Sequence, residues 1–320
     1  MNRAISGIQP SGKLHIGNYF GMMKPAIEMQ KEYETFLFVA DYHALTTVQD
    51  PKILKSLTKD AVLDFLACGI NPEYTCLYRQ SDVPQVHELS WFLSVLTPMG
   101  LLERCHSYKD KVAKGLDATH GLFSYPILMA ADILSIEASF VPVGKDQKQH
   151  VEVTRDLATK FNHIFGEVFQ LPNPLINDHV ASISGIDGQK MSKSYNNTIE
   201  IFEDEKVLKK KIMKIVTDSK NLEDQKNPDE CNIFSLYKLF ANDVEQKELA
   251  KTYLAGGMGY GFAKNELFQK VSKYFESIRE KRIALETDDD YIEDILKNGA
   301  KKVSVIADNV LNNVKSAIGL

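Results

Sequence analysis

The sequence predicts an α/β protein whose first half forms a parallel sheet and whose second half is helical. Short strand-like runs alternate with helix-like segments in the first half of the 320 residues. This alternation is typical of parallel sheets covered by helices on both faces. Beyond residue 197 nearly every segment has helical periodicity and no strand stands out. The length suits about two domains, each with its own core.

The elements of the first half follow from local signals. The run at 35–40 is β-branched and aromatic, as in buried parallel strands. Asp50 and Pro51 open a helix as its cap and first residue, and Gly69 is suited to end it. The expected strands are residues 4–7, 35–40, 75–78 and 139–143. The expected helices are residues 17–32, 51–68, 87–96 and 147–165.

Composition excludes several classes of protein. Charged residues make up 25% and apolar residues 44%, with a net charge of −5, so the chain is neither disordered nor of low complexity. No apolar run is long enough for a signal peptide or a membrane helix. The four cysteines form no Cys-x-x-Cys pair and the eight histidines lack ligand spacing, so we expect no metal-ligating residues. Free thiols suit a reducing compartment, and we expect a cytoplasmic protein.

Two segments are candidates for binding phosphate. Residues 7–18 run from a strand through a Gly/Pro/Ser turn into a helix that begins near His15, and helix N-termini attract anions. Gly17 has no Cβ, so an adenine or ribose could approach its backbone. Lys190 and Lys193 stand three residues apart in a polar loop, where they could form a mobile clamp on polyphosphate.

Together the two segments resemble a known family. The run His15-Ile16-Gly17-Asn18 is similar to the HIGH motif of class I aminoacyl-tRNA synthetases, and Lys190 to Ser194 matches the KMSKS motif of that class. Further runs are similar to the bacterial tryptophanyl-tRNA synthetase family. These runs are residues 7–12, 41–44, 128–134, 141–150 and 216–219.

The chain departs from the family pattern in three places. The HIGH-like motif ends in Asn18, as is usual in this family, rather than in His. Lys145 stands where the family usually has Glu. Residues 185–189 lack the common Pro and second Lys of the family.

The resemblance implies a Rossmann-like catalytic domain at 1–195, with a dimer-forming insertion and the KMSKS loop. It further implies a helical anticodon-binding domain at 196–290 and a C-terminal helix at 291–320 that returns to the catalytic domain. The implied activity is tryptophan–tRNA ligation. Tryptophan reacts with Mg·ATP to give tryptophanyl-adenylate and pyrophosphate, and is then transferred to the 3′ end of tRNA. The implied partners are L-tryptophan, ATP, Mg²⁺ bound with ATP, tRNA(Trp) and a second copy of the chain.

The site residues implied by the resemblance fall into three groups. The catalytic residues are His15, Asn18, Lys111, Lys190 and Lys193. The ATP site comprises Gln9, Pro10, Ser11, Gly12, His15, Gly17, Asn18, Gly144, Asp146, Gln147, Lys190, Met191, Ser192, Lys193 and Ser194. The tryptophan site comprises Ile5, Gly7, Gln9, His43, Tyr125, Met129, Asp132, Val141, Val143 and Gln147.

Asp132 is the residue expected to recognise the indole. Tyr125, Met129 and Asp132 are spaced i, i+4 and i+7 and therefore share one face of an expected helix. An apolar wall interrupted by one carboxylate suits an indole, whose only polar atom is an N–H donor. A buried carboxylate left without that donor would disfavour phenylalanine.

Three alternatives remain open from the sequence. A tyrosyl-tRNA synthetase would share the architecture, although the segment around Asp132 and the run 141–150 argue against it. A non-catalytic protein that binds tryptophan or RNA would not need the intact Lys190, Lys193 and His15. A simple adenylyltransferase of the HIGH superfamily would not need the helical part after residue 197.

Overall fold

The computed structural model describes the chain except for residues 1, 106–107, 110–112, 114, 116, 145–146 and 177–182, and the side chain of residue 194. The chain divides into two compact units. Unit 1 comprises Met1–Gly12, Pro25–Asp178 and Leu285–Leu320, and unit 2 comprises Lys13–Lys24 and His179–Ala284. Within the described residues, no helix is both long enough and apolar enough to cross a bilayer.

Unit 1 is built on a five-stranded parallel sheet in the order β3-β2-β1-β4-β5. The strand order reverses at β1, which is the arrangement of a Rossmann-like sheet. The strands are β1 (Arg3–Ile8), β2 (Glu34–Val39), β3 (Thr75–Arg79), β4 (Phe140–Val143) and β5 (Asn173–Ile176).

Helices connect these strands. The helix α4 begins as expected, because the Asp50 carboxylate accepts hydrogen bonds from the N–H groups of Lys52 and Ile53 at 2.8 and 3.0 Å. It ends at Gly69, whose φ of 117° is left-handed. The helices of this unit are α2 (Lys24–Met29), α3 (Asp41–Ala44), α4 (Pro51–Cys68), α5 (Gln85–Leu96), α6 (Met99–Glu103), α8 (His120–Leu134), α9 (Lys148–Phe165) and α14 (Asp289–Ile318), with a 3₁₀ turn at Gln80–Asp82.

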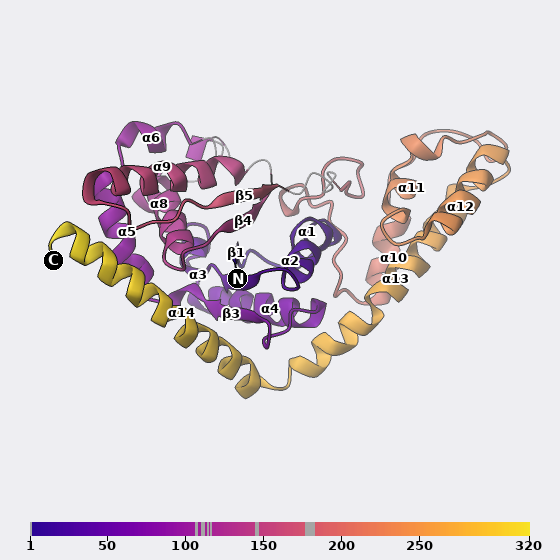
Figure 1. Cartoon of the computed structure of the whole chain (residues 1–320). Coiled ribbons are helices and arrows are strands. Elements are labelled where there is room, and N and C mark those ends of the chain that lie inside the picture. The colour runs from indigo at the N-terminus through magenta and orange to yellow at the C-terminus, as the bar shows by residue number, and fades with distance from the viewer. Residues whose placement is uncertain are drawn as a thin grey trace. The chain divides into compact units, whose positions relative to one another are not determined.

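The core of unit 1 combines the sheet with α5, α8, α9 and α14. Its buried residues include Ile5, Phe36 and Phe38 from the strands and Val303 from α14. The helix α14 lies along β3, and α8 lies beside α9 (Figure 1). Gly299 makes the first of these contacts possible, because a Cβ at that position would lie 2.0 Å from the Leu77 carbonyl oxygen.

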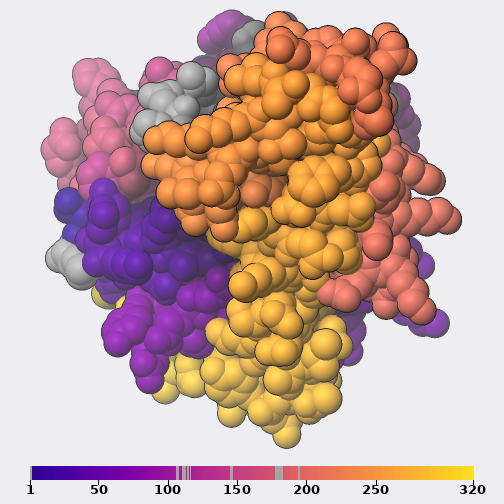
Figure 2. Space-filling view, turned by 90° about the vertical axis from the view of Figure 1, so that its right-hand side faces the viewer, coloured from indigo at the N-terminus to yellow at the C-terminus, as the bar shows by residue number. Residues whose placement is uncertain are grey.

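Unit 2 is helical apart from short bridges. Its elements are α1 (Ile16–Asn18), a π-helix (Tyr19–Met23), a 3₁₀ turn (Lys193–Tyr195), α10 (Glu205–Met213), a 3₁₀ turn (Pro228–Glu230), α11 (Asn232–Tyr237), α12 (Asp243–Ala255) and α13 (Tyr260–Leu285). Figure 2 shows the outer surface of α12 and α13 in orange tones.

Aromatic packing holds the N-terminal segment of unit 2 to its helices. Tyr19 and Phe20 meet Tyr274 with ring centroids 5.9 and 5.8 Å apart. Two further rings complete the cluster. The centroid of Phe240 lies 5.3 Å from that of Phe20, and the centroid of Phe275 lies 5.0 Å from that of Tyr19. These contacts explain why residues 13–24 belong to this unit.

The predicted elements of the first half are confirmed, with two differences. Residues 17–32 do not form one helix, because the π-helix interrupts it and α2 ends at Met29. The strand β5 was not expected from the sequence, since Pro174 lies inside it. Proline is tolerated there because β5 pairs only with β4, at the edge of the sheet.

Candidate active site

Three predicted site residues of unit 1, together with Gln80, follow the carboxyl ends of neighbouring strands. Gln9 follows β1, His43 lies in α3 just after β2, Gln80 follows β3 and Gly144 follows β4. In open α/β sheets, ligands bind outside the carboxyl ends of the strands, where the strand order reverses. Here that point is β1, so the sheet itself indicates this edge as a binding site.

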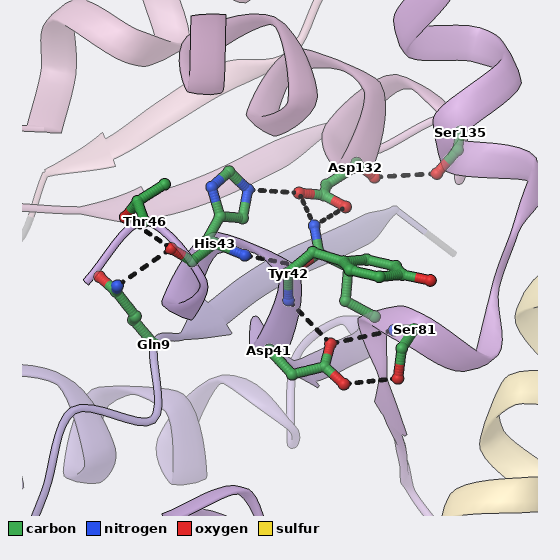
Figure 3. Close-up of polar contacts among 9 residues, drawn as sticks. Gln9, Asp41, Tyr42, His43, Thr46, Ser81, Asp132 and Ser135 are labelled. Carbon is green, nitrogen blue, oxygen red and sulfur yellow. Dashed lines mark hydrogen bonds and ion pairs between the residues drawn. The ribbon is translucent and has the colours of Figure 1, made fainter. Parts of the chain in front are cut away.

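Asp132 lies at the centre of a polar cluster behind this edge. It belongs to α8, which Thr119 caps by accepting a hydrogen bond from the Leu122 N–H, and it is 2% exposed. His43 Nε2 lies 3.0 Å from Oδ2 of Asp132 (Figure 3). The Gln80 side-chain amide lies 2.9 Å from both carboxylate oxygens of Asp132. Burial raises the pKa of Asp132, and the hydrogen bonds from His43 and Gln80 oppose that rise.

The Asp132 carboxylate can take one further donor. An ionised carboxylate offers about four lone-pair sites. Within the described part of the chain, the contacts with Gln80 and His43 use three of these sites. The remaining site matches a ligand with a single N–H group in an otherwise apolar ring.

Four of the predicted tryptophan-site residues belong to the apolar core of unit 1 or pack against it. Ile5 of β1 and Val141 of β4 are 1% and 3% exposed. Met129 of α8 and Val143 of β4 are partly buried and pack against the same core. The structure therefore brings these four predicted tryptophan-site residues into one apolar cluster.

Tyr125 and Gln9 join the cluster through His43. The Tyr125 ring lies edge-on to the His43 ring at 6.0 Å, and its hydroxyl is 2.8 Å from Nε2 of His150. The Gln9 amide donates to the His43 carbonyl oxygen at 3.2 Å (Figure 3). Gly7 is exposed. Packing requires glycine at this position, because a Cβ would lie 2.5 Å from the Phe38 ring.

The HIGH-like segment and the KMSKS segment lie together within unit 2. The Ile16 N–H donates to the Ile199 carbonyl oxygen at 2.9 Å, and the Ile201 N–H donates to that of Leu14 at 3.1 Å. Between these bonds, His15 pairs with Glu200 in an antiparallel bridge. The segment after the KMSKS motif thus fixes the start of the HIGH-like helix.

His15 caps α1 as the sequence predicts. Its Nδ1 accepts a hydrogen bond from the Asn18 N–H at 3.3 Å, and the Asn18 side chain accepts one from the His15 N–H at 3.4 Å. Burial and then the charge of Lys193 lower the pKa of His15 to about 4, against an opposing effect of Glu200. His15 is therefore neutral at pH 7.

Gly17 belongs to the HIGH-like motif and lies where this motif meets the KMSKS segment. A Cβ at this position would be 3.0 Å from Nδ1 of His15 and 3.5 Å from Cβ of Met191. Met191 is buried, whereas Lys190 and Lys193 on either side of it are exposed. The buried methionine anchors a loop that presents two lysine side chains to solvent.

Comparison with known proteins identifies the family. Residues 1–276 match the family model described as tRNA synthetases class I (W and Y). The chain belongs to this family. It is 54% identical to the Tryptophan--tRNA ligase of Fusobacterium nucleatum over 321 residues, covering 100% of this chain and 98% of the relative.

Solved structures agree with the family. The crystal structure of tryptophanyl-tRNA synthetase from Campylobacter jejuni complexed with ADP and tryptophan superposes with a TM-score of 0.95 at 52% identity, covering 99% of this chain and all of that one. The crystal structure of tryptophanyl-tRNA synthetase from Mycoplasma pneumoniae superposes with a TM-score of 0.85 at 32% identity, covering 100% of this chain and 98% of that one.

Other predicted residues of this synthetase lie near the ends of β1 and β4. Gly144 and Gln147 are exposed, and the Gln147 N–H donates to the Gly144 carbonyl oxygen at 2.9 Å before α9 begins. After β1, Pro10 is buried, whereas Ser11 and Gly12 are exposed. Lys111, Lys145 and Asp146 lie outside the described residues.

Sequence reasoning missed two side chains that organise the clusters. Gln80 is fully buried against Asp132, and Asn197 bonds to the KMSKS segment. The position of Gln80 directly after a strand could have identified it, since ligands bind at the carboxyl ends of the strands in such sheets. Among the described residues, no three His, Cys, Asp or Glu side chains are arranged to hold a metal ion.

Proposed function

We propose that this class I synthetase is a tryptophan–tRNA ligase. It joins L-tryptophan to Mg·ATP, forming tryptophanyl-adenylate and pyrophosphate, and then transfers tryptophan to the 3′ end of its tRNA. The observation that carries the proposal is the buried Asp132 carboxylate, which has one acceptor site left within an apolar cluster. Relatives 50–54% identical over their full length share the name Tryptophan--tRNA ligase.

In this proposal the indole N–H donates to Asp132. The apolar cluster around Met129 and Val143 holds the ring, and Gln9, Tyr125 and Gln147 hold the amino and carboxyl groups of the substrate. Because the polar atoms of Asp132 are fixed by Gln80 and His43, the carboxylate is oriented before the substrate arrives. Phenylalanine would leave the last acceptor site of the carboxylate unsatisfied.

The first step needs no nucleophile from the protein. A carboxylate oxygen of tryptophan attacks the α-phosphorus of ATP, and the bond from that phosphorus to the bridging oxygen of pyrophosphate breaks. Lys190 and Lys193, together with Lys111, neutralise the charge that develops on pyrophosphate, while neutral His15 and Asn18 contact the phosphates. Magnesium enters as part of the substrate Mg·ATP, bound mainly by phosphate oxygens and water.

A measurement of ATP–pyrophosphate exchange tests the proposal, with tryptophan and tyrosine compared side by side. We expect exchange that strongly favours tryptophan. A preference for tyrosine would refute the role of Asp132 but not that of the phosphate motifs. Tryptophan binding without exchange would favour a regulatory protein over an enzyme.

We further propose that unit 1 pairs with a second copy of the chain. Trp91 and Val95 of α5 and Met99 of α6 are 67%, 69% and 64% exposed, and exposed apolar patches of this kind mark interaction sites. In analytical ultracentrifugation the wild-type protein should sediment as a dimer and Trp91→Glu as a monomer. A monomeric wild-type protein would rule out the pairing.

The remaining assignments concern tRNA and location. We propose that the helical residues 196–290 bind the anticodon region of tRNA(Trp), with the catalytic domain at 1–195 and the returning helix at 291–320. Cys68, Cys76, Cys105 and Cys231 are free thiols, which is consistent with work in the reducing cytoplasm. A filter-binding assay with the isolated tRNA, repeated at two salt concentrations, tests the first point.

A further inference from the structure

We infer that Asn197 is a positioning residue that holds the two lysines of the KMSKS loop in place for adenylate formation. Asn197 follows the loop and is 1% exposed. Its Oδ1 accepts a hydrogen bond from the Ser192 N–H at 2.8 Å. Its Nδ2 donates to the Lys190 carbonyl oxygen at 3.1 Å and to Oδ1 of Asp187 at 2.8 Å.

These contacts join the segments on both sides of the loop. Asp187 lies in the turn that precedes Lys190, and its Oδ1 also accepts the Gln189 N–H at 3.0 Å. The backbone closes the same gap, because the Ile186 N–H donates to the Asn197 carbonyl oxygen at 3.0 Å. The amide of Asn197 therefore ties the loop at its entry, its middle and its exit.

The surrounding packing fixes this amide. A Cβ on Gly185 would lie 2.4 to 2.6 Å from atoms of Asn197, so the backbone of the preceding turn rests directly on the side chain. Gly185 is held in turn by Asn232, whose Nδ2 donates to its carbonyl oxygen at 2.8 Å. A buried group enclosed in this way has one available orientation.

Only an amide side chain of this length satisfies all three partners. Two of them, the Lys190 carbonyl and the Asp187 carboxylate, are acceptors, and the third, the Ser192 N–H, is a donor. Aspartate at position 197 would keep the bond to Ser192 but would turn an oxygen towards both acceptors. The substitution thus tests the two donated bonds with almost no change of volume.

The inference rests on the proposed function, since positioning matters only if Lys190 and Lys193 act on pyrophosphate. Lys190 and Lys193 lie on either side of Ser192, whose N–H donates to Asn197 Oδ1. Release of this tie lets both charges move, and a misplacement of about 1 Å can cost about 100-fold in rate. The residues proposed to bind tryptophan lie in unit 1, whereas the three described partners of the Asn197 amide lie in unit 2.

The variant Asn197→Asp, assayed by ATP–pyrophosphate exchange, tests the role. We expect kcat to fall about 10- to 100-fold while KM for tryptophan stays unchanged. The matched control is Asn196→Asp, which adds the same charge to the adjacent exposed side chain. The control should retain wild-type kcat. Equal kcat in the two variants would overturn the inference.

A reciprocal variant separates positioning from general destabilisation. In Asp187→Asn combined with Asn197→Asp, residue 187 becomes the donor and residue 197 the acceptor, so part of the lost kcat should return. No recovery of kcat in the double variant would contradict the inference.

Two further measurements keep the test decisive. If aspartate prevents folding, Asn197→Ala removes the three bonds without adding charge, and wild-type kcat in that variant would overturn the inference. Hydrogen exchange of the amides at 190–196, measured without substrates, should be faster in Asn197→Asp than in Asn196→Asp. This readout holds even if the wild-type protein shows no pyrophosphate exchange, which would refute the proposed function alone. Equal exchange rates in the two variants would refute the placement of Asn197 itself.

Discussion

Substitution of Asp132 by asparagine separates substrate recognition from stability. The new side chain has the same shape, and its oxygen can still accept from Gln80, while its amide can donate to Nε2 of His43 in the tautomer that carries the proton on Nδ1. The lost interaction is the charged acceptor for the indole N–H. Hydrogen bonds to charged groups contribute about 1.5–3 kcal/mol. We therefore expect kcat/KM for tryptophan to fall about 10- to 150-fold.

The same change should not lower the free energy of unfolding at pH 7. Burial raises the pKa of Asp132, so the folded protein binds its proton more readily than the unfolded chain does. The carboxylate therefore contributes stability at low pH that is lost as the pH rises through its folded-state pKa. Asparagine has no such titration. The stability of the wild-type protein relative to Asp132→Asn should consequently decline as the pH rises towards 7.

The assays are ATP–pyrophosphate exchange at varied tryptophan concentration and urea denaturation at several pH values. Asp156→Asn is the matched control, because it removes the same charge from an exposed position on α9. The preference for tryptophan over phenylalanine should shrink in Asp132→Asn and persist in the control. Unchanged kcat/KM in Asp132→Asn would refute the assignment of the indole N–H to this carboxylate.

Three other predictions follow from the geometry. Lys193→Ala should slow adenylate formation far more than it weakens tryptophan binding, as measured by single-turnover kinetics and equilibrium dialysis; the opposite pattern would remove Lys193 from the phosphate site. Gly299→Ala should lower the free energy of unfolding, measured by urea denaturation, by about 3 kcal/mol or more, because its Cβ would lie 2.0 Å from the Leu77 carbonyl oxygen. In the control Gly121→Ala the new Cβ meets no atom within 4 Å, so the free energy of unfolding should change little. The pKa of His15 is lowered to about 4, so the unfolded chain binds a proton at this residue more readily than the folded protein does. As the pH falls from 6.5 to 4, the wild-type protein should therefore lose about 2 kcal/mol of stability relative to His15→Asn. If the difference in unfolding free energy between the two proteins did not change with pH, the burial of a neutral ring would be contradicted.

Elements with local signals were predictable. The helix α4 has its cap, its proline and its terminal glycine in the sequence, and the structure uses each of them. The runs that became β2 and β3 were likewise recognisable, since their residues other than Glu34 and Arg79 at the ends are apolar, aromatic or threonine. Such elements depend little on partners distant in the sequence.

Elements fixed by distant partners were not predictable. Asn173–Ile176 becomes β5 only through its pairing with β4, and Pro174 argues against a strand locally. The helix expected at 17–32 is interrupted where Tyr19 and Phe20 pack on Phe240 and Tyr274, more than 200 residues along the chain. No periodicity within 17–32 contains that information.

The candidate site divides in the same way. Lys190, Lys193 and Asp132 could be proposed from the sequence, because the motifs that contain them resemble those of the family and their residue types suit the proposed roles. Gln80 and Asn197 have amide side chains that are common in loops, and their importance lies in the partners that the fold supplies. Only the structure shows that Gln80 bonds to the Asp132 carboxylate and that Asn197 bonds to the backbone of the lysine loop.

This division follows from the chemistry of the proposed reaction. Tryptophan supplies the nucleophile and ATP the leaving group, so the protein contributes position and charge rather than a reactive side chain. Position is set by groups that make several directional bonds at once, and a buried amide makes three such bonds at Asn197. The rate should therefore be sensitive to uncharged residues that never touch the substrate. In such an enzyme, a neutral amide behind a lysine loop can control kcat as strongly as a lysine within it.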